Sequence, residues 1–280
     1  MKIGKYEISS INTGEFCLDG GAMFGIIPKP LWEKTNLSDD RNRVVLNSRC
    51  LLLENGSRKI LIDTGIGSNW DEKFMDIYRI DQTQNSLFNS LEKQGVKPEE
   101  ITDIILTHLH FDHTGGAVLF SEGEVFPAFP NAKYYVQKKH FDWAKNPSEK
   151  DKGSFVQDRF IPLAEEGVLQ FIENEEYFDD EIELILFDGH TPAQQLLKIS
   201  DSSNTLFYCG DLIPFSSHLR LPYIMSFDLN PLKTLSEKKI ILKKALIEDW
   251  ILIFEHDPYN IAVKIEERGK KYSVKENVEI

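Results

Sequence analysis

The sequence is poor in cysteine, in positive charge and in long apolar runs. Its three cysteines, Cys17, Cys50 and Cys209, lie far apart and form no CxxC pair. This number and spacing predict neither a disulfide framework nor a thiolate zinc site. No apolar run approaches the roughly 20 residues of a membrane span, and the N-terminal residues lack the apolar core of a secretory signal. We therefore expect a cytoplasmic protein without a membrane partner.

The charge balance excludes a second class of partner. Lys and Arg total 32 against 45 Asp and Glu, which gives a formal net charge of −13. Such a surface repels a phosphate backbone, so we do not expect nucleic acid to bind. The length of 280 residues fits one large domain or two small ones, and the 41% hydrophobic content is that of a globular protein. We expect a single domain over residues 1–280.

The order of the apolar runs indicates the fold class. Helical patterns at 85–95, 137–146 and 232–250 lie between several strand-like runs. Those runs lie at residues 49–56, 59–65, 103–108, 132–137, 182–189, 205–211 and 250–257. Strands that alternate with helices predict an α/β layered fold, and residues 259–280 read as a short strand pair that closes a sheet.

The stretch "LTHLHFDHTGG" at residues 106–116 holds three of the seven histidines. It follows a buried strand, and ligands collect where strands of α/β sheets give way to loops. His108 and His110 are two positions apart, so in an extended chain they point the same way and can share one metal ion. Asp112 and His113 turn in another direction and can serve a second ion. We expect the two glycines that follow to start the next helix.

Further ligand-type residues stand at the ends of later strands. His190, Asp211 and His256 each follow an apolar run, and they bring the set to five histidines and two aspartates. Imidazole and carboxylate ligands suit Zn²⁺, with Mn²⁺, Co²⁺ and Fe²⁺ as alternatives. His140, midway along a predicted helix, reads as an ordinary structural histidine, and Cys209 reads as a small buried hydrophobe.

The motifs "THLHFDHTGG", "DGHTP", "GDLIP" and "FEHDP", in this order, resemble those of the metallo-β-lactamase superfamily. The resemblance implies a four-layer αββα sandwich with two divalent metal ions at one edge of the paired sheets. It implies that Asp63, in "LIDTG", supports the site without being a ligand. It implies a first ion held by His108, His110 and His190, a second held by Asp112, His113 and His256, and a bridging Asp211.

Two ions in such a site can hold a bridging hydroxide whose pKa falls towards about 7 and which attacks a carbonyl or phosphoryl centre. Asp112 is the expected proton carrier. The bridging aspartate together with His113 argues against β-lactam hydrolysis. The sequence resembles instead the N-acyl-homoserine lactonases and methyl-parathion-hydrolase-like enzymes. We expect hydrolysis of lactones or other esters; the alternatives are a phosphotriesterase or phosphodiesterase, and a non-catalytic metal-binding protein.

An apolar loop at about residues 14–36 precedes the first long strand. One interpretation is a flap that contacts the substrate through Met23, Phe24 and Ile26. The other is a segment that packs on the sheet edge or on a second copy in a homodimer. The sequence leaves these two interpretations equal.

The substrate-polarising residue departs from the family pattern. Several homoserine lactonases have a tyrosine three residues after the bridging aspartate, and here that position is Pro214. Tyr223 and His218 are the candidate replacements.

Overall fold

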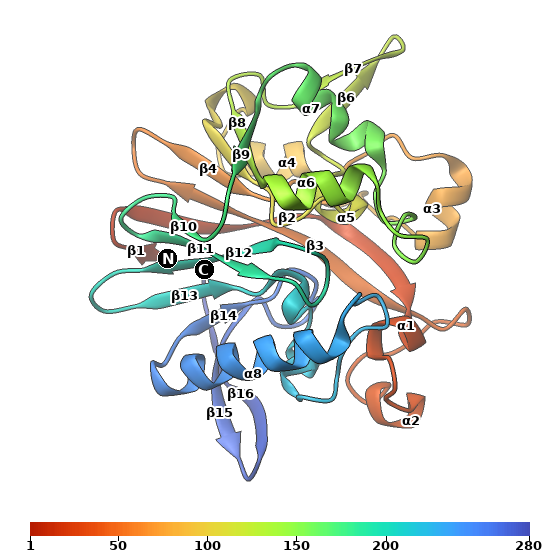
Figure 1. Ribbon diagram of the computed structural model, residues 1–280, viewed down its shortest axis with the longest axis vertical. Coiled ribbons are helices and arrows are strands. Elements are labelled where there is room, and N and C mark those ends of the chain that lie inside the picture. The colour runs from red at the N-terminus through yellow and green to blue at the C-terminus, as the bar shows by residue number, and fades with distance from the viewer. The chain divides into compact units, whose positions relative to one another are not determined.

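The computed structural model describes residues 1–280 (Figure 1). The chain divides into two compact units. Unit one consists of residues 1–15, 48–174 and 193–195, and unit two of residues 16–47, 175–192 and 196–280. No helix is both long and apolar enough to cross a membrane.

The first sheet has seven strands in the order β1-β2-β3-β4-β5-β8-β9. The four strands β4, β5, β8 and β9 run parallel, and β3 pairs with β4 antiparallel. The bounds are β1 Lys2–Ile3, β2 Tyr6–Asp19, β3 Arg43–Glu54, β4 Lys59–Ile62, β5 Asp103–Ile105, β8 Lys133–Gln137 and β9 Leu169–Ile172. A separate hairpin is formed by β6, Val118–Ser121, and β7, Glu124–Pro127.

Three helices of unit one, α4, α6 and α7, pack on this sheet through one apolar cluster. The bounds are α3 Glu72–Tyr78, α4 Leu87–Lys93, α5 Phe111–Thr114, α6 Lys138–Lys145, α7 Ile161–Glu165, and the 3₁₀ turns η1 Pro98–Glu100 and η2 Gln157–Arg159. The start of α4 shows why these residues form a helix: the Ser86 side chain caps the Asn89 N–H, while Leu87 and Leu91 are buried.

The second sheet has seven strands in the order β10 to β16. The pairs β10–β11, β12–β13, β14–β15 and β15–β16 are antiparallel, and β13 pairs with β14 in parallel. Its α8 lies along the strands (Figure 1) and shares a buried cluster with β13, β14 and β15. The strand bounds are β10 Glu176–Tyr177, β11 Ile182–Phe187, β12 Gln194–Ser200, β13 Thr205–Tyr208, β14 Ile251–Ile253, β15 Ala262–Arg268 and β16 Lys271–Val278. The helix bounds are α1 Gly20–Phe24, α2 Lys29–Trp32, η3 Gly210–Leu212, η4 Ser216–Leu219 and α8 Pro231–Ile247.

The elements expected from the sequence are present. Each strand-like run holds a strand, the three helical patterns correspond to α4, α6 and α8, and the tail forms the pair β15–β16 at the edge of its sheet. The elements β6, β7, β9, β10, β12, α1 to α3, α5 and α7 were not expected, and most of them are too short to carry a clear periodic pattern.

The expectation that Gly115 and Gly116 start a helix is wrong. The helix α5 ends before them, and β6 follows. A Cβ on Gly115 would lie 1.9 Å from the Ile66 carbonyl oxygen, and one on Gly116 would lie 2.4 Å from the Thr64 carbonyl oxygen. The glycines are therefore required by the close approach of two backbone segments.

The segment at residues 14–36 is not a free loop. It contains the end of β2 and the helices α1 and α2, and the Asp19 side chain caps α1 by accepting the Ala22 N–H. Met23 and Phe24 are fully buried, and the Phe24 ring stacks on Trp32 at a centroid distance of 5.0 Å. Ile26 and Leu31 project outward, with 88% and 49% of their surface exposed. Met23, Phe24 and Trp32 fill a local core.

This packing predicts unequal costs for two neighbouring truncations. Phe24→Ala should lower the free energy of unfolding by about 3–5 kcal/mol, because it leaves a cavity among aromatic rings. Ile26→Ala should change it by less than about 0.5 kcal/mol. Urea unfolding of both variants measures the difference. A Phe24→Ala variant as stable as Ile26→Ala would show that Phe24 is not part of the core.

Candidate metal centre

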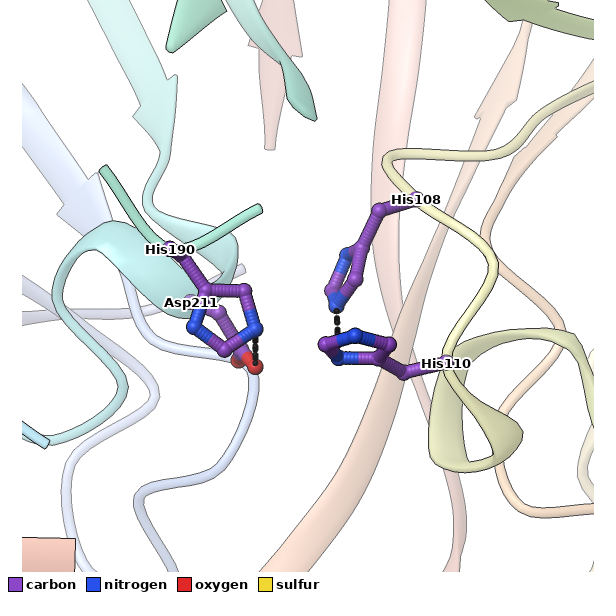
Figure 2. Close-up of side chains that lie close together, drawn as sticks. All are labelled: His108, His110, His190 and Asp211. Carbon is purple, nitrogen blue, oxygen red and sulfur yellow. Dashed lines mark hydrogen bonds and ion pairs between the residues drawn. The ribbon is translucent and has the colours of Figure 1, made fainter. Parts of the chain in front are cut away.

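Four predicted ligands of unit one lie together after β5. His108, His110, Asp112 and His113 are all buried, with at most 7% of any residue exposed. The last two lie on α5, whose first residue follows His110. His108 Nε2 and His110 Nδ1 lie 3.0 Å apart, and Figure 2 shows the two rings meeting through these atoms.

The Asp63 carboxylate orients two of these imidazoles. It accepts the Thr107 N–H and the Thr107 hydroxyl, each at 2.7 Å, and the Nδ1–H of His113 at 3.1 Å. Since the Thr107 hydroxyl donates to Asp63, its oxygen accepts from His108 Nδ1, 3.0 Å away. Both histidines therefore keep Nε2 for a metal ion, which is how supporting carboxylates act around metal ligands. Asp63 supports the site, as the sequence resemblance implied.

His140 holds the backbone between the first two ligands. Its Nε2 accepts the N–H of Leu109 at 2.8 Å, and its side chain is fully buried on α6. The structural role expected for His140 is confirmed. Its tertiary partner explains why an imidazole, with an acceptor nitrogen, stands in an otherwise apolar helix face.

The three predicted ligands of unit two also lie together. One oxygen of Asp211 is 3.0 Å from His190 Nε2, and the other is 3.0 Å from His256 Nε2. Figure 2 shows the His190–Asp211 pair. The opposite nitrogens of the two rings meet protein oxygens: His190 Nδ1 lies 2.9 Å from Asp228, and His256 Nδ1 lies 2.9 Å from the Asn47 carbonyl oxygen. A carboxylate that serves a different imidazole with each oxygen has the arrangement of a bridging ligand.

The His190 loop is built on α8. The Glu237 carboxylate accepts the N–H groups of Asp188 at 2.9 Å and Gly189 at 3.1 Å. A Cβ on Gly189 would lie 2.5 Å from the Thr234 backbone nitrogen, so the loop touches the helix backbone to backbone. Asp228 and Glu237 were missed in the sequence because neither stands at a strand end nor in a ligand motif.

Electrostatics favour a proton on His190 in the metal-free protein. Burial by itself lowers the pKa of His190, but the Asp211 and Asp228 carboxylates outweigh it and raise the pKa to about 9. A metal ion must displace this proton from Nε2, so metal affinity falls as pH falls.

The candidate substrate contacts of unit two lie in the core. His218 is 1% exposed, its Nε2–H donates to the Met23 carbonyl oxygen at 2.9 Å, and burial lowers its pKa to about 3. Tyr223 is 6% exposed, and its hydroxyl accepts from Arg220 at 3.1 Å. His218 is therefore a neutral imidazole whose hydrogen bond to Met23 holds α1 in place. The substrate roles of Met23, Phe24, Ile26, His218 and Tyr223 stay predictions, and the burial of all but Ile26 weighs against a direct contact.

The donor set fits zinc. Two nitrogens at about 2.0–2.1 Å from a tetrahedral Zn²⁺ are roughly 3.3 Å apart, close to the His108–His110 spacing of 3.0 Å. All the candidate donors are imidazole nitrogens or carboxylate oxygens. Cys209 adds no thiolate: it is fully buried in an apolar cluster, and burial raises the pKa of its thiol.

Comparisons with known proteins bear on the family and fold of the chain. A sequence model described as the metallo-beta-lactamase superfamily matches residues 43–256. An N-acyl homoserine lactonase from Bacillus sp is 26% identical over 228 residues, which cover 74% of this chain and 80% of that protein. A probable metallo-hydrolase from Mycobacterium tuberculosis is 20% identical over 252 residues, 77% of this chain and 76% of that protein.

Solved structures match the whole chain. A probable metal-dependent hydrolase from Staphylococcus aureus superposes with a TM-score of 0.89 at 26% identity, and the match covers 99% of this chain and 100% of that one. AidC, described as a dizinc quorum-quenching lactonase, superposes with a TM-score of 0.81 at 23% identity, over 100% of this chain and 97% of that one. At 23% identity, the likeness to AidC shows the fold alone.

The pairing of His190 with Asp228 predicts a pH effect on the metal-free protein. The pKa of His190 is raised from 6.5 to about 9, so protonated His190 stabilises the folded state. This contribution is fully present below pH 6.5 and is lost as the pH rises through about 9. Its size is on the order of 3 kcal/mol. Asp228→Asn should reduce it, because Asn keeps an acceptor oxygen but loses the charge. Urea unfolding at several pH values between 6 and 10 measures the slope, and equal slopes for both proteins would contradict the assignment.

Proposed function

Because the chain belongs to the metallo-β-lactamase superfamily, we propose that it uses two divalent metal ions to hydrolyse lactones or other carboxylic esters. It is a metallo-hydrolase of this superfamily, and it has the metallo-β-lactamase fold with mixed α/β sheets that the sequence predicted. Support for the lactone substrate comes from the N-acyl homoserine lactonases among its relatives.

The observation that carries the proposal is the position of Asp211 between two imidazoles, with one oxygen 3.0 Å from each Nε2. We assign a first ion to His108, His110 and His190, a second ion to Asp112, His113 and His256, and Asp211 to both. The family match includes every one of these residues. We therefore propose that the two units act as one catalytic domain, residues 1–280.

The bound ions, which we take to be Zn²⁺, would supply a water of lowered pKa and positive charge for the developing oxyanion. Asp112 is the group of this chain that we assign to proton transfer. Its carboxylate is on α5, 3.7 Å from His113 Nε2, and it is 6% exposed. A carboxylate held at this position can take a proton from the attacking water and pass it to the leaving oxygen.

Aromatic side chains beside the ligand loop favour a substrate with an apolar arm. Phe111, which separates His110 from Asp112, meets the rings of Phe74 and Tyr78 at centroid distances of 5.2 and 4.9 Å. Met75 and Ile77, which belong to α3 as Phe74 and Tyr78 do, are 45% and 42% exposed. Apolar surface of this kind can bind an acyl chain, with each buried CH₂ contributing up to about 0.8 kcal/mol.

The proposed function predicts two metal equivalents and lactone turnover. Protein purified without chelator should hold close to two ions per chain by elemental analysis. The loaded protein should open N-acyl homoserine lactones faster than it cleaves a phosphotriester or a chromogenic cephalosporin. Preference for the phosphotriester would favour the phosphoesterase alternative. Full metal occupancy with no turnover of any ester would favour a non-catalytic metal-binding protein.

The role of Asp112 is tested by comparing turnover with metal content. Asp112→Asn keeps the size of the side chain but cannot accept a proton. It should bind the second ion less tightly and should remain about 10²–10⁴-fold slower than the parent even at saturating metal. His113→Ala is the control, because its imidazole is assigned only as a ligand, and excess metal should recover more of its activity. Full recovery of loaded Asp112→Asn would reduce Asp112 to a ligand alone.

A further inference from the structure

A buried arginine in unit one has main-chain carbonyls as its hydrogen-bond partners. Arg159, the last residue of η2, is 3% exposed. Its Nη1 donates to the carbonyl oxygens of Ser68 at 2.8 Å and Gly115 at 3.1 Å, and its Nη2 donates to that of Asn69 at 3.0 Å. Burial lowers its pKa to about 10, so it remains charged at neutral pH. A buried charge is costly, and here carbonyl dipoles compensate it.

The same guanidinium lies between two aromatic rings. Its central carbon is 3.8 Å from the centroid of Trp70 and 4.5 Å from that of Phe120. Cation–π contacts strengthen when they are desolvated. The Trp70 ring also has a hydrogen bond of its own: its Nε1–H donates to the Ile66 carbonyl oxygen at 2.9 Å, which fixes the position of the ring. Arg159 therefore holds the segment that leads into α3 by its backbone and by its tryptophan.

A stack of rings continues from Trp70 to the ligand loop. Trp70 stacks on Phe74 at a centroid distance of 4.2 Å and an interplanar angle of 12°. Phe74 meets Phe111 edge to face at 5.2 Å. The helix α3 has only seven residues, none of them buried, and so short a helix is not stable by itself. These rings join the helix to the ligand loop, and the backbone bridge between Glu15 and Asp81 holds the chain just after it.

We propose that Arg159 is a positioning residue: it holds the aromatic face of α3 against Phe111 and thereby sets how tightly the protein binds the apolar arm of its substrate. The placement of α3 is independent of the proposed function, whereas the effect on substrate rests on it. Lysine cannot replace Arg159, because a single ammonium cannot bond carbonyls of two segments and lie over two rings at once.

The test compares Arg159→Lys with the parent as full-length, zinc-loaded proteins. Hydrogen exchange of the α3 amides should accelerate by at least about tenfold in the variant. The KM for an N-decanoyl homoserine lactone should rise by about tenfold more than the KM for the N-butanoyl lactone, with kcat and zinc content nearly unchanged.

Two further variants make the test specific. Arg58→Lys is the matched control. Arg58 is a partly buried arginine of unit one that pairs with a carboxylate instead of carbonyls: its Nε and Nη2 lie 3.0 and 2.9 Å from the Asp103 oxygens. It should leave exchange of α3 unchanged. Trp70→Leu keeps Arg159 and breaks the ring stack, so it should loosen α3 as Arg159→Lys does, and it carries the test if Arg159→Lys fails to fold.

The outcomes separate the parts of the proposal. Unchanged α3 exchange in a folded Arg159→Lys or Trp70→Leu protein would overturn it. Faster exchange with equal KM changes for both lactones would overturn the effect on substrate. If the parent opens no lactone, the proposed function fails, and hydrogen exchange still decides whether Arg159 positions α3.

Discussion

Four of the five candidate ligand histidines share one constraint, which is that their Nδ1–H groups must be donated to protein oxygens; the exception is His110, whose Nδ1 lies 3.0 Å from His108 Nε2. Two of the acceptors are carboxylates, one is a hydroxyl and one is a main-chain carbonyl, and all four pairs are buried. The pairs are His108 with Thr107, His113 with Asp63, His190 with Asp228 and His256 with the Asn47 carbonyl. Each bond fixes the tautomer and the ring orientation, so Nε2 is left for a metal ion.

Much of the surrounding structure follows from holding those acceptors in place. Asp63 stands directly after β4, in a left-handed conformation with φ of 57°, and reaches Thr107 beyond the parallel neighbour β5. The backbone after Asp63 touches the end of α5 so closely that Gly115 and Gly116 have no room for a side chain. In unit two, α8 performs the corresponding task through Glu237 and the close contact at Gly189.

The ligand loop is joined to the protein surface by aromatic contacts. Phe111 belongs to the metal motif and also contacts the rings of Phe74 and Tyr78 on α3. Met75 and Ile77 of the same helix are exposed. A short helix without a buried residue can shift at small energetic cost, in contrast to the buried strands beside it. The candidate ligand loop thus lies beside an adjustable apolar surface on α3, and Arg159 contacts both segments, at Gly115 and at Trp70.

The sequence by itself determined the alternation of strands and helices and the seven ligand-type residues, because apolar periodicity and ligand spacing are local properties of the chain. It also identified His140 and Cys209 as structural residues. It did not determine the placement of residues 14–36, which it treated as a loop and which instead packs Phe24 on Trp32 in a local core. Tertiary structure alone decided that Asp228 meets His190, that Glu237 holds Gly189 and that Arg159 reaches Ser68 and Gly115. These partners are 38 to 91 positions apart in the chain, and a single carboxylate or guanidinium has no periodic signature. Which of the many charged residues reaches a ligand loop is fixed only when the close-packed core sets the position of its backbone.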